Sequence, residues 1–212
     1  MPPTTILLFF FAFLFLSLAS CAPPPAFPPT SPSHDRATLF IRSRCNLTRY
    51  PDLCFSSLSS YAAAVGGSSP ELARVAANVT LARLRGLRAH VSALRRAGAV
   101  RGTAAAALRD CSEQLGDAAD QVCQTYDELR GVEELVGMEV AWRVSNAQTW
   151  MSAALTNEES CSDGFREAAA ASAYGAAGSG VDVKTDICSR VRRVKQYTSN
   201  ALALVNSLVG GR

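Results

Sequence analysis

The sequence predicts an all-α protein, an up-down four-helix bundle preceded by an N-terminal helical hairpin and stapled by disulfides. Three observations carry this prediction. Four long segments place apolar residues at the i, i+3, i+4 and i+7 spacing of an amphipathic helix. No stretch alternates apolar and polar residues for long enough to indicate a strand. Finally, cysteines recur in every part of the chain after residue 44.

Residues 1–21 are predicted to be a secretory signal peptide. The apolar run from Ile6 to Leu18 has the length of a signal core and is shorter than the ~20 residues that a membrane helix needs. Small residues around Cys21 allow cleavage there. A bacterial lipoprotein signal, with lipid on Cys21, is the alternative, but the expected basic residues before the apolar run are missing. We expect the mature chain to be secreted and not to span a membrane.

The next segment, residues 22–36, is rich in proline and is predicted to be a flexible leader. A single domain is expected over residues 37–209. It begins with a helical hairpin over residues 37–61, whose two short helices, 37–44 and 51–61, flank a turn. Cys45 and Cys54 lie across that turn, so a disulfide between them would close the hairpin.

The bundle is expected over residues 69–209. Ser69 is the predicted N-cap, with Pro70 at the first helical position of a helix over residues 71–97. Gly98 and Gly102 mark the turn into a second helix over residues 103–135. A third helix is predicted over residues 138–159 and a fourth over 183–209, and the Gly/Ala/Ser-rich residues 164–180 are predicted to form a loop.

Secretion places the cysteines in an oxidising compartment, so they are interpreted first as disulfide partners. Cys111 is early in the second bundle helix and Cys161 follows the third. Antiparallel neighbours bring those two ends together. Cys123 is about 18 Å farther along its helix, at ~1.5 Å per residue, and cannot replace Cys111. Cys188 is then the only plausible disulfide partner of Cys123. The two residues are expected to lie a turn or two apart along the bundle axis, which is too far for a disulfide, so we expect two free thiols. A Cys123–Cys188 disulfide is the alternative.

Two sequons, at Asn46 and Asn78, are predicted glycosylation sites on a secretory route.

Charge is distributed unevenly along the first two bundle helices. Residues 71–109 hold eight arginines and one acid, whereas residues 110–139 hold nine acids and one arginine. Either the two helices complement each other, or one of them presents a recognition surface. Glu113, Asp117 and Asp120 follow the i, i+4, i+7 spacing and are predicted to form one exposed stripe. Carboxylates on a convex helix face favour binding over acid-base catalysis.

Sites for other chemistry are not indicated. The only histidines are His34, in the leader, and His90, among arginines, and there is no HExxH, CxxC, GxGxxG or phosphate-binding loop. We therefore expect no enzyme activity, no metal and no cofactor. Nucleic acid is disfavoured as a partner because the chain leaves the cell and its arginines lack interleaved aromatic residues. The free protein is expected to be monomeric.

The pattern as a whole resembles the plant invertase and pectin methylesterase inhibitor family over residues 37–209. The resemblance rests on Tyr50-Pro51-Asp52-Leu53-Cys54, on the Ala106–Cys111 segment, on Gln148–Asn157 through Cys161-Ser162-Asp163-Gly164-Phe165, and on Thr198–Ala203. It implies a hairpin followed by a four-helix bundle, disulfides Cys45–Cys54 and Cys111–Cys161, and a chain that binds a cell-wall enzyme and has no activity itself.

Within this family the chain is more similar to the methylesterase inhibitors. The Pro-Lys-Phe motif of invertase inhibitors is absent, and the Thr149–Thr156 run matches the methylesterase branch. That branch covers the enzyme's pectin-binding cleft in a 1:1 complex. The implied interface residues are Glu113, Asp117, Asp120, Gln148, Ser152, Thr156, Ser160 and Asp163. Inhibition of cell-wall or vacuolar invertase is one alternative, and a secreted carrier of a lipid or other small molecule is another.

Overall fold

The structure is a computed structural model that describes residues 32–172 and 180–209. It contains helices and no strand within these ranges. The elements are α2 (Pro32–Cys45), α3 (Pro51–Leu58), η1 (Ser59–Tyr61), α4 (Ala62–Val65), α5 (Ser69–Arg96), α6 (Gly102–Glu128), η2 (Val132–Glu134), α7 (Met138–Ser172) and α8 (Gly180–Asn206). The predicted signal peptide and most of the predicted leader lie outside the described residues.

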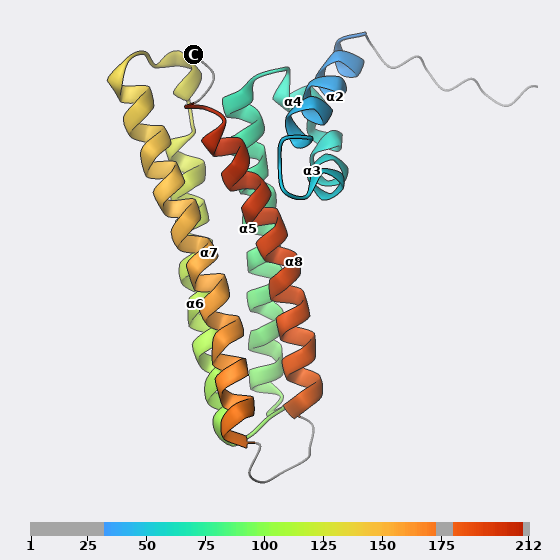
Figure 1. Cartoon of the computed structure of the whole chain (residues 1–212), viewed down its shortest axis with the longest axis vertical. Helices are drawn as coiled ribbons and strands as arrows, with labels where there is room; N and C mark the ends of the chain where they lie inside the picture. The colour runs from blue at the N-terminus through green and yellow to red at the C-terminus, as the bar shows by residue number, and fades with distance from the viewer. Residues whose placement is uncertain (1–31, 173–179, 210–212) are drawn as a thin grey trace, which may run out of the picture. The chain divides into compact units, whose positions relative to one another are not determined.

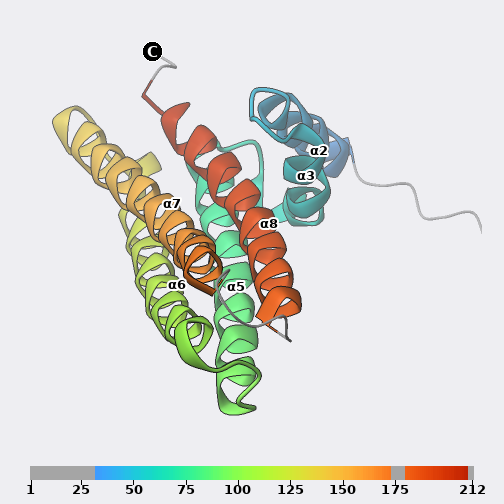
Figure 2. The same ribbon diagram turned by 60° about the horizontal axis from the view of Figure 1, so that its bottom comes forward.

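The four long helices form the predicted up-down bundle (Figure 1). Each packs against two others in the cyclic order α5, α6, α7, α8, and the short helices α2 to α4 pack at one end against α5 and α8. Figure 2 shows the same order from another side. The prediction of an all-α bundle with an N-terminal hairpin is therefore confirmed.

The core is built from the apolar stripes that the sequence indicated. Every long helix contributes completely or almost completely buried side chains, among them Leu84, Leu108, Leu115, Met151 and Ile187. Burying a side chain of this size stabilises the folded state by about 1.5–3 kcal/mol. The core is continuous from the hairpin, through Ile41 and Leu58, into the bundle.

Both predicted disulfides are present, Cys45–Cys54 in the hairpin and Cys111–Cys161 between α6 and α7. Cys123 and Cys188 are free and half-buried, as the unequal levels of the two residues predicted. One detail was wrong: Cys161 lies inside α7 rather than beyond its end.

Several helix limits differ from the prediction. α2 begins at Pro32, so residues 32–36, assigned to the flexible leader, are helical. Proline is well tolerated in the first turn of a helix, where its missing N–H costs no hydrogen bond, and Asp35 suits that end electrostatically. The N-cap of α5 is Ser68 rather than Ser69, because the Ser68 hydroxyl accepts the Glu71 N–H at 3.2 Å.

The second and third bundle helices differ most. α6 ends at Glu128 instead of near residue 135, and Gly131 then takes a left-handed φ of 69°. α7 continues to Ser172, so residues 164–172 of the predicted loop are helical. Phe165, only 2% exposed, packs into the core and holds this extension in place. Residues 173–179 of that loop lie outside the described residues.

Candidate functional site

The helices α6 and α7 are joined by covalent and polar contacts along most of their shared length. The disulfide Cys111–Cys161 links the two helices. Farther along, Asn157 Nδ2 donates to Gln121 Oε1 at 3.0 Å, and Asn146 Nδ2 donates to Glu128 Oε1 at 3.0 Å. These contacts fix the antiparallel register, so side chains on the two helices keep constant neighbours.

The predicted acidic stripe lies on the outer face of α6. Glu113, Asp117 and Asp120 are all exposed, whereas Leu115 and Ala118 between them are buried. Within the described ranges, none of the three carboxylates has an ion pair or a hydrogen bond to another side chain. They are therefore open to solvent and available to a partner.

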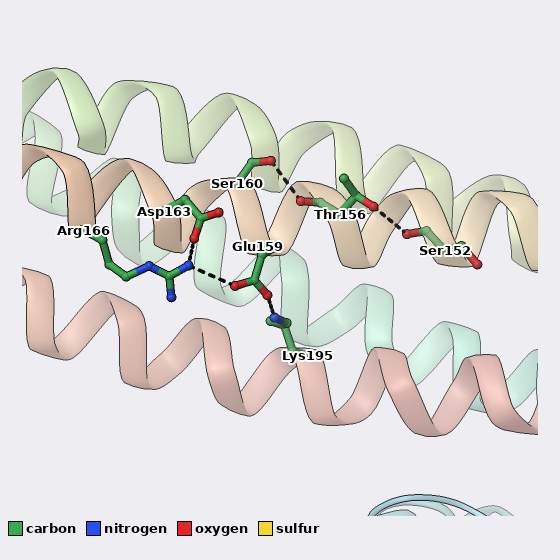
Figure 3. Close-up of polar contacts among 7 residues, drawn as sticks. All are labelled: Ser152, Thr156, Glu159, Ser160, Asp163, Arg166 and Lys195. Carbon is green, nitrogen blue, oxygen red and sulfur yellow. Dashed lines mark hydrogen bonds and ion pairs between the residues drawn. The ribbon is translucent and has the colours of Figure 1, made fainter.

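The predicted residues of α7 form a second row, at i, i+4, i+8, i+12 and i+15. Gln148 is half-buried, Ser152, Thr156 and Ser160 are exposed, and Asp163 is half-buried. The Thr156 and Ser160 hydroxyls donate to the carbonyls of the residues four before them, at 3.2 and 3.0 Å (Figure 3). This leaves their oxygens free to accept hydrogen bonds from a partner.

At the end of this row, Asp163 is engaged within the molecule. Its carboxylate pairs with Arg166, which also lies 3.3 Å from Glu159, and Glu159 pairs with Lys195 on α8 (Figure 3). Asp163 thus differs from the exposed acids of α6, because its negative charge is already compensated.

One exposed residue of each row lies near the contact between the two helices. Asp117 lies one turn before Gln121, and Ser160 lies one turn after Asn157, the residue to which Gln121 is bonded. The other exposed members of both rows point away from the core, on the outer surfaces of these neighbouring helices. We call the eight predicted interface residues the α6–α7 face.

The α7 row extends toward the N-terminal end of that helix, beyond the residues predicted from the sequence. Met138 is 88% exposed and Trp142 is 66% exposed. Both follow the helical row through Ser145 and Thr149, which are also exposed, to Ser152. The sequence does contain a signal for the exposure of Trp142, because this residue falls outside the apolar stripe of Val144, Ala147 and Met151.

The opposite charges of α5 and α6 do not pair. No ion pair within the described ranges joins an arginine of α5 to an acid of α6. The Arg88 guanidinium instead lies beside Gly116, where an added Cβ would be 3.1 Å from it. The structure therefore does not support direct electrostatic complementarity between these helices.

His90 has a structural role. Its Nε2 lies 2.6 Å from the Asp186 carboxylate, which also accepts a hydrogen bond from Arg190, so α5 is tied to α8. Burial alone would raise the pKa of Asp186, but these hydrogen bonds outweigh it and lower that pKa. Among the described residues, no group of three or more His, Cys, Asp and Glu side chains could hold a metal ion.

No helix among the described residues is long and apolar enough to cross a membrane.

Comparison with known proteins gives consistent results. Residues 39–204 match the family described as "Plant invertase/pectin methylesterase inhibitor". The chain is 37% identical over 173 residues to the "21 kDa protein" of Daucus carota, covering 81% of this chain and 84% of that protein. It is 35% identical over 206 residues to "Pectinesterase inhibitor 11" of Arabidopsis thaliana, covering 96% and 94%.

A similar fold occurs in a solved structure. The crystal structure of a mutant form of a pectin methylesterase inhibitor from Arabidopsis superposes with a TM-score of 0.55 at 18% identity. The match covers 76% of this chain and 92% of that one.

Proposed function

This chain belongs to the plant invertase/pectin methylesterase inhibitor family, and we propose that it is a secreted inhibitor of pectin methylesterase. It would cover the enzyme's pectin-binding cleft in a 1:1 complex. The name of a relative that matches almost the whole chain, "Pectinesterase inhibitor 11", supports this target. The family is one of inhibitors, so we assign the chain no catalytic activity of its own.

The observation that carries the proposal is the exposure of the α6–α7 face. The three carboxylates that α6 contributes to it lack partners within the described residues, and its hydroxyl row on α7 presents acceptor oxygens. A helix pair locked by a disulfide loses little conformational freedom on binding, which favours affinity. Trp142 and Met138 add an apolar end to this polar face, and aromatic side chains are frequent anchors of protein interfaces.

The proposed mechanism is steric. A bound inhibitor excludes pectin from the cleft, so inhibition is competitive with the polysaccharide. Because part of the contact is electrostatic and lies at the surface, inhibition weakens as the ionic strength rises.

A secretory route remains part of the proposal. The apolar run of residues 6–18 is its basis, and the two sequons fit it, because the side chains of Asn46 and Asn78 are both exposed.

No observation favours the alternatives over this proposal. The Pro-Lys-Phe motif that the resemblance associates with invertase inhibitors is absent. A lipid carrier needs space inside the bundle, but Leu84, Leu115 and Met151 fill it.

The test is an assay of methanol release from methyl-esterified pectin, with the purified mature chain titrated against several plant pectin methylesterases at mildly acidic pH. We expect slower release, with a raised apparent KM and unchanged kcat. Invertase activity is measured in parallel. Inhibition of invertase alone, or of neither enzyme, would show that the proposed target is wrong.

The site is tested with a triple variant, Glu113→Gln, Asp117→Asn and Asp120→Asn. We expect it to inhibit at least tenfold less well. The matched control is Asp35→Asn with Asp52→Asn and Glu167→Gln, which removes three exposed carboxylates outside the α6–α7 face and should inhibit like the unmodified chain.

A further inference from the structure

A groove of about 570 Å³ runs along the outside of the bundle between α7 and α8, and none of its lining residues belongs to the α6–α7 face. α8 lines it with Lys184, Cys188, Arg192, Lys195 and Ser199, which form one helical row. α7 supplies Leu155, Glu159, Ser162 and Arg166, and the loop between α2 and α3 closes one end with Arg49 and Tyr50.

The lining is strongly basic. Five of its side chains are cationic and one, Glu159, is anionic. Glu159 pairs with Lys195 and Arg166, so the acid fastens these two cations to the groove wall (Figure 3). Arg49, Lys184 and Arg192 have no ion pair within the described ranges. Their charges are therefore not compensated by an acid of the described residues.

The loop that closes the groove is held firmly. The Tyr50 backbone N–H donates to Asn200 Oδ1 at 3.0 Å, and Asn200 Nδ2 donates back to the Tyr50 carbonyl at 2.9 Å. Asn200 is almost completely buried. Arg49 and Tyr50 thus keep a fixed position relative to α8, and the groove is preformed.

The dimensions favour an extended anion. From Lys184 to Ser199 the α8 row spans about 22 Å at ~1.5 Å per residue, and Lys184 and Arg192 are about 12 Å apart. A single phosphate or carboxylate cannot reach both. A protein partner would meet a flat surface more readily than a groove of this volume, which is in the range of small-ligand sites.

We propose that this groove binds an acidic polysaccharide, specifically a run of de-esterified galacturonate units. Hydrolysis of a pectin methyl ester leaves a carboxylate, so the choice of ligand rests on the proposed function: the product of the target enzyme carries the charges that the groove complements. Serine hydroxyls at positions 162 and 199 supply donors for sugar hydroxyls. The inhibitor would thereby be retained where de-esterification has already begun.

Binding is tested with the purified chain and three polymers: polygalacturonate, highly methyl-esterified pectin and neutral dextran. We expect polygalacturonate alone to bind well, and the affinity to fall with ionic strength. In Lys184→Gln with Arg192→Gln, polygalacturonate affinity should fall at least tenfold. The control pair, Arg85→Gln with Arg95→Gln, removes the same charge from exposed positions of α5 and should bind normally.

Three results would overturn the proposal. These are absence of binding to polygalacturonate, equal losses in the groove and control variants, which would indicate an effect of net charge, and equal binding of inorganic phosphate, which would indicate a small-anion site. A further result would also overturn it: a groove variant that loses methylesterase inhibition but keeps polygalacturonate binding would mark the groove as a protein contact. Conversely, a chain that inhibits nothing but binds polygalacturonate in the groove refutes the proposed function and leaves this site intact.

Cys188 provides a second, independent readout. It lines the groove as a free thiol, whereas Cys123, also free, lies on α6. Bound polygalacturonate should slow alkylation of Cys188 at least severalfold and leave Cys123 unchanged, as measured by peptide mass spectrometry. Equal rates for Cys188 with and without the polymer would contradict binding at this place.

Discussion

Thr198 on α8 donates a hydrogen bond of 2.6 Å to the carboxyl group of Glu158 on α7, at a point in the bundle where both side chains are completely buried. The second carboxyl oxygen of Glu158 has no hydrogen-bond partner. Burial raises the pKa of Glu158 to about 8, although the Thr198 hydrogen bond and the charge of Lys195 oppose the rise. Glu158 is therefore neutral in the folded chain at mildly acidic pH.

This proton makes stability depend on pH. Between the ordinary pKa of 4.5 and about 8 the folded chain keeps a proton that the unfolded chain has lost, so the free energy of unfolding falls as the pH rises through this window. We expect a total loss of roughly 5 kcal/mol from this group over the whole window. In urea unfolding, the unmodified chain should have a lower free energy of unfolding at pH 8.5 than at pH 5. Most of this difference should disappear in Glu158→Gln. It should persist in Glu167→Gln, an exposed acid of the same helix. A difference of the same size in both variants would contradict the assignment.

Replacement of Asn200 by Asp should loosen the hairpin from α8. The substitution keeps the shape but removes the Nδ2 donor, so the Tyr50 carbonyl loses its partner and faces an oxygen. We expect a loss of about 1–3 kcal/mol in the free energy of unfolding. Asn206→Asp, an exposed position on α8, is the control and should change stability little. Equal stability of the two variants would show that this contact does not hold the hairpin.

The two disulfides should contribute unequally. In the chain-entropy model, the stabilisation grows with the length of the closed loop, which is 50 residues for Cys111–Cys161 and 9 for Cys45–Cys54. Paired Cys→Ala replacement should therefore cost about 4 kcal/mol for the first and about 3 kcal/mol for the second. Denaturant unfolding of both variants measures this. A larger loss from the hairpin pair would indicate that the native-state contacts of the hairpin dominate.

Trp142 should matter for binding and not for folding. It is 66% exposed, so Trp142→Ala should leave the thermal midpoint nearly unchanged while weakening methylesterase inhibition about 30-fold, as expected for an interface hot spot of ~2 kcal/mol. Leu39→Ala is the matched control, because Leu39 has the same exposed fraction on α2. If the Trp142 variant inhibits as well as the unmodified chain, Trp142 does not contribute to the contact with the enzyme, and that contact is limited to the polar rows.

The sequence predicted most of the fold because its signals are local. Heptad-like apolar spacing located the four bundle helices, and the order of antiparallel helices by itself pairs Cys111 with Cys161. The same helical spacing also located the exposed acids of α6, since Glu113, Asp117 and Asp120 alternate with the buried positions of one helix. Their role as an interface stays a prediction.

The errors have physical causes. Residues 164–172 contain Gly164 and several small residues, which suggested a loop, but alanine is the strongest helix former and Phe165 anchors the extension in the core. The basic groove could not be anticipated. Three of its five cations come from the basic segment 184–195 on α8, but the other two come from the hairpin loop and from α7, so only the folded chain brings all five together.

The central claim is that the α6–α7 face blocks a pectin methylesterase, and a bulky substitution within that face tests it most directly. Thr156 is exposed in the middle of the hydroxyl row, so Thr156→Arg should fold normally but keep the enzyme from seating. Ser43→Arg, at an exposed position of α2, is the control. In a titration of methanol release, the unmodified chain and Ser43→Arg should inhibit alike, and Thr156→Arg at least tenfold less. Equal inhibition by all three proteins would contradict the claim.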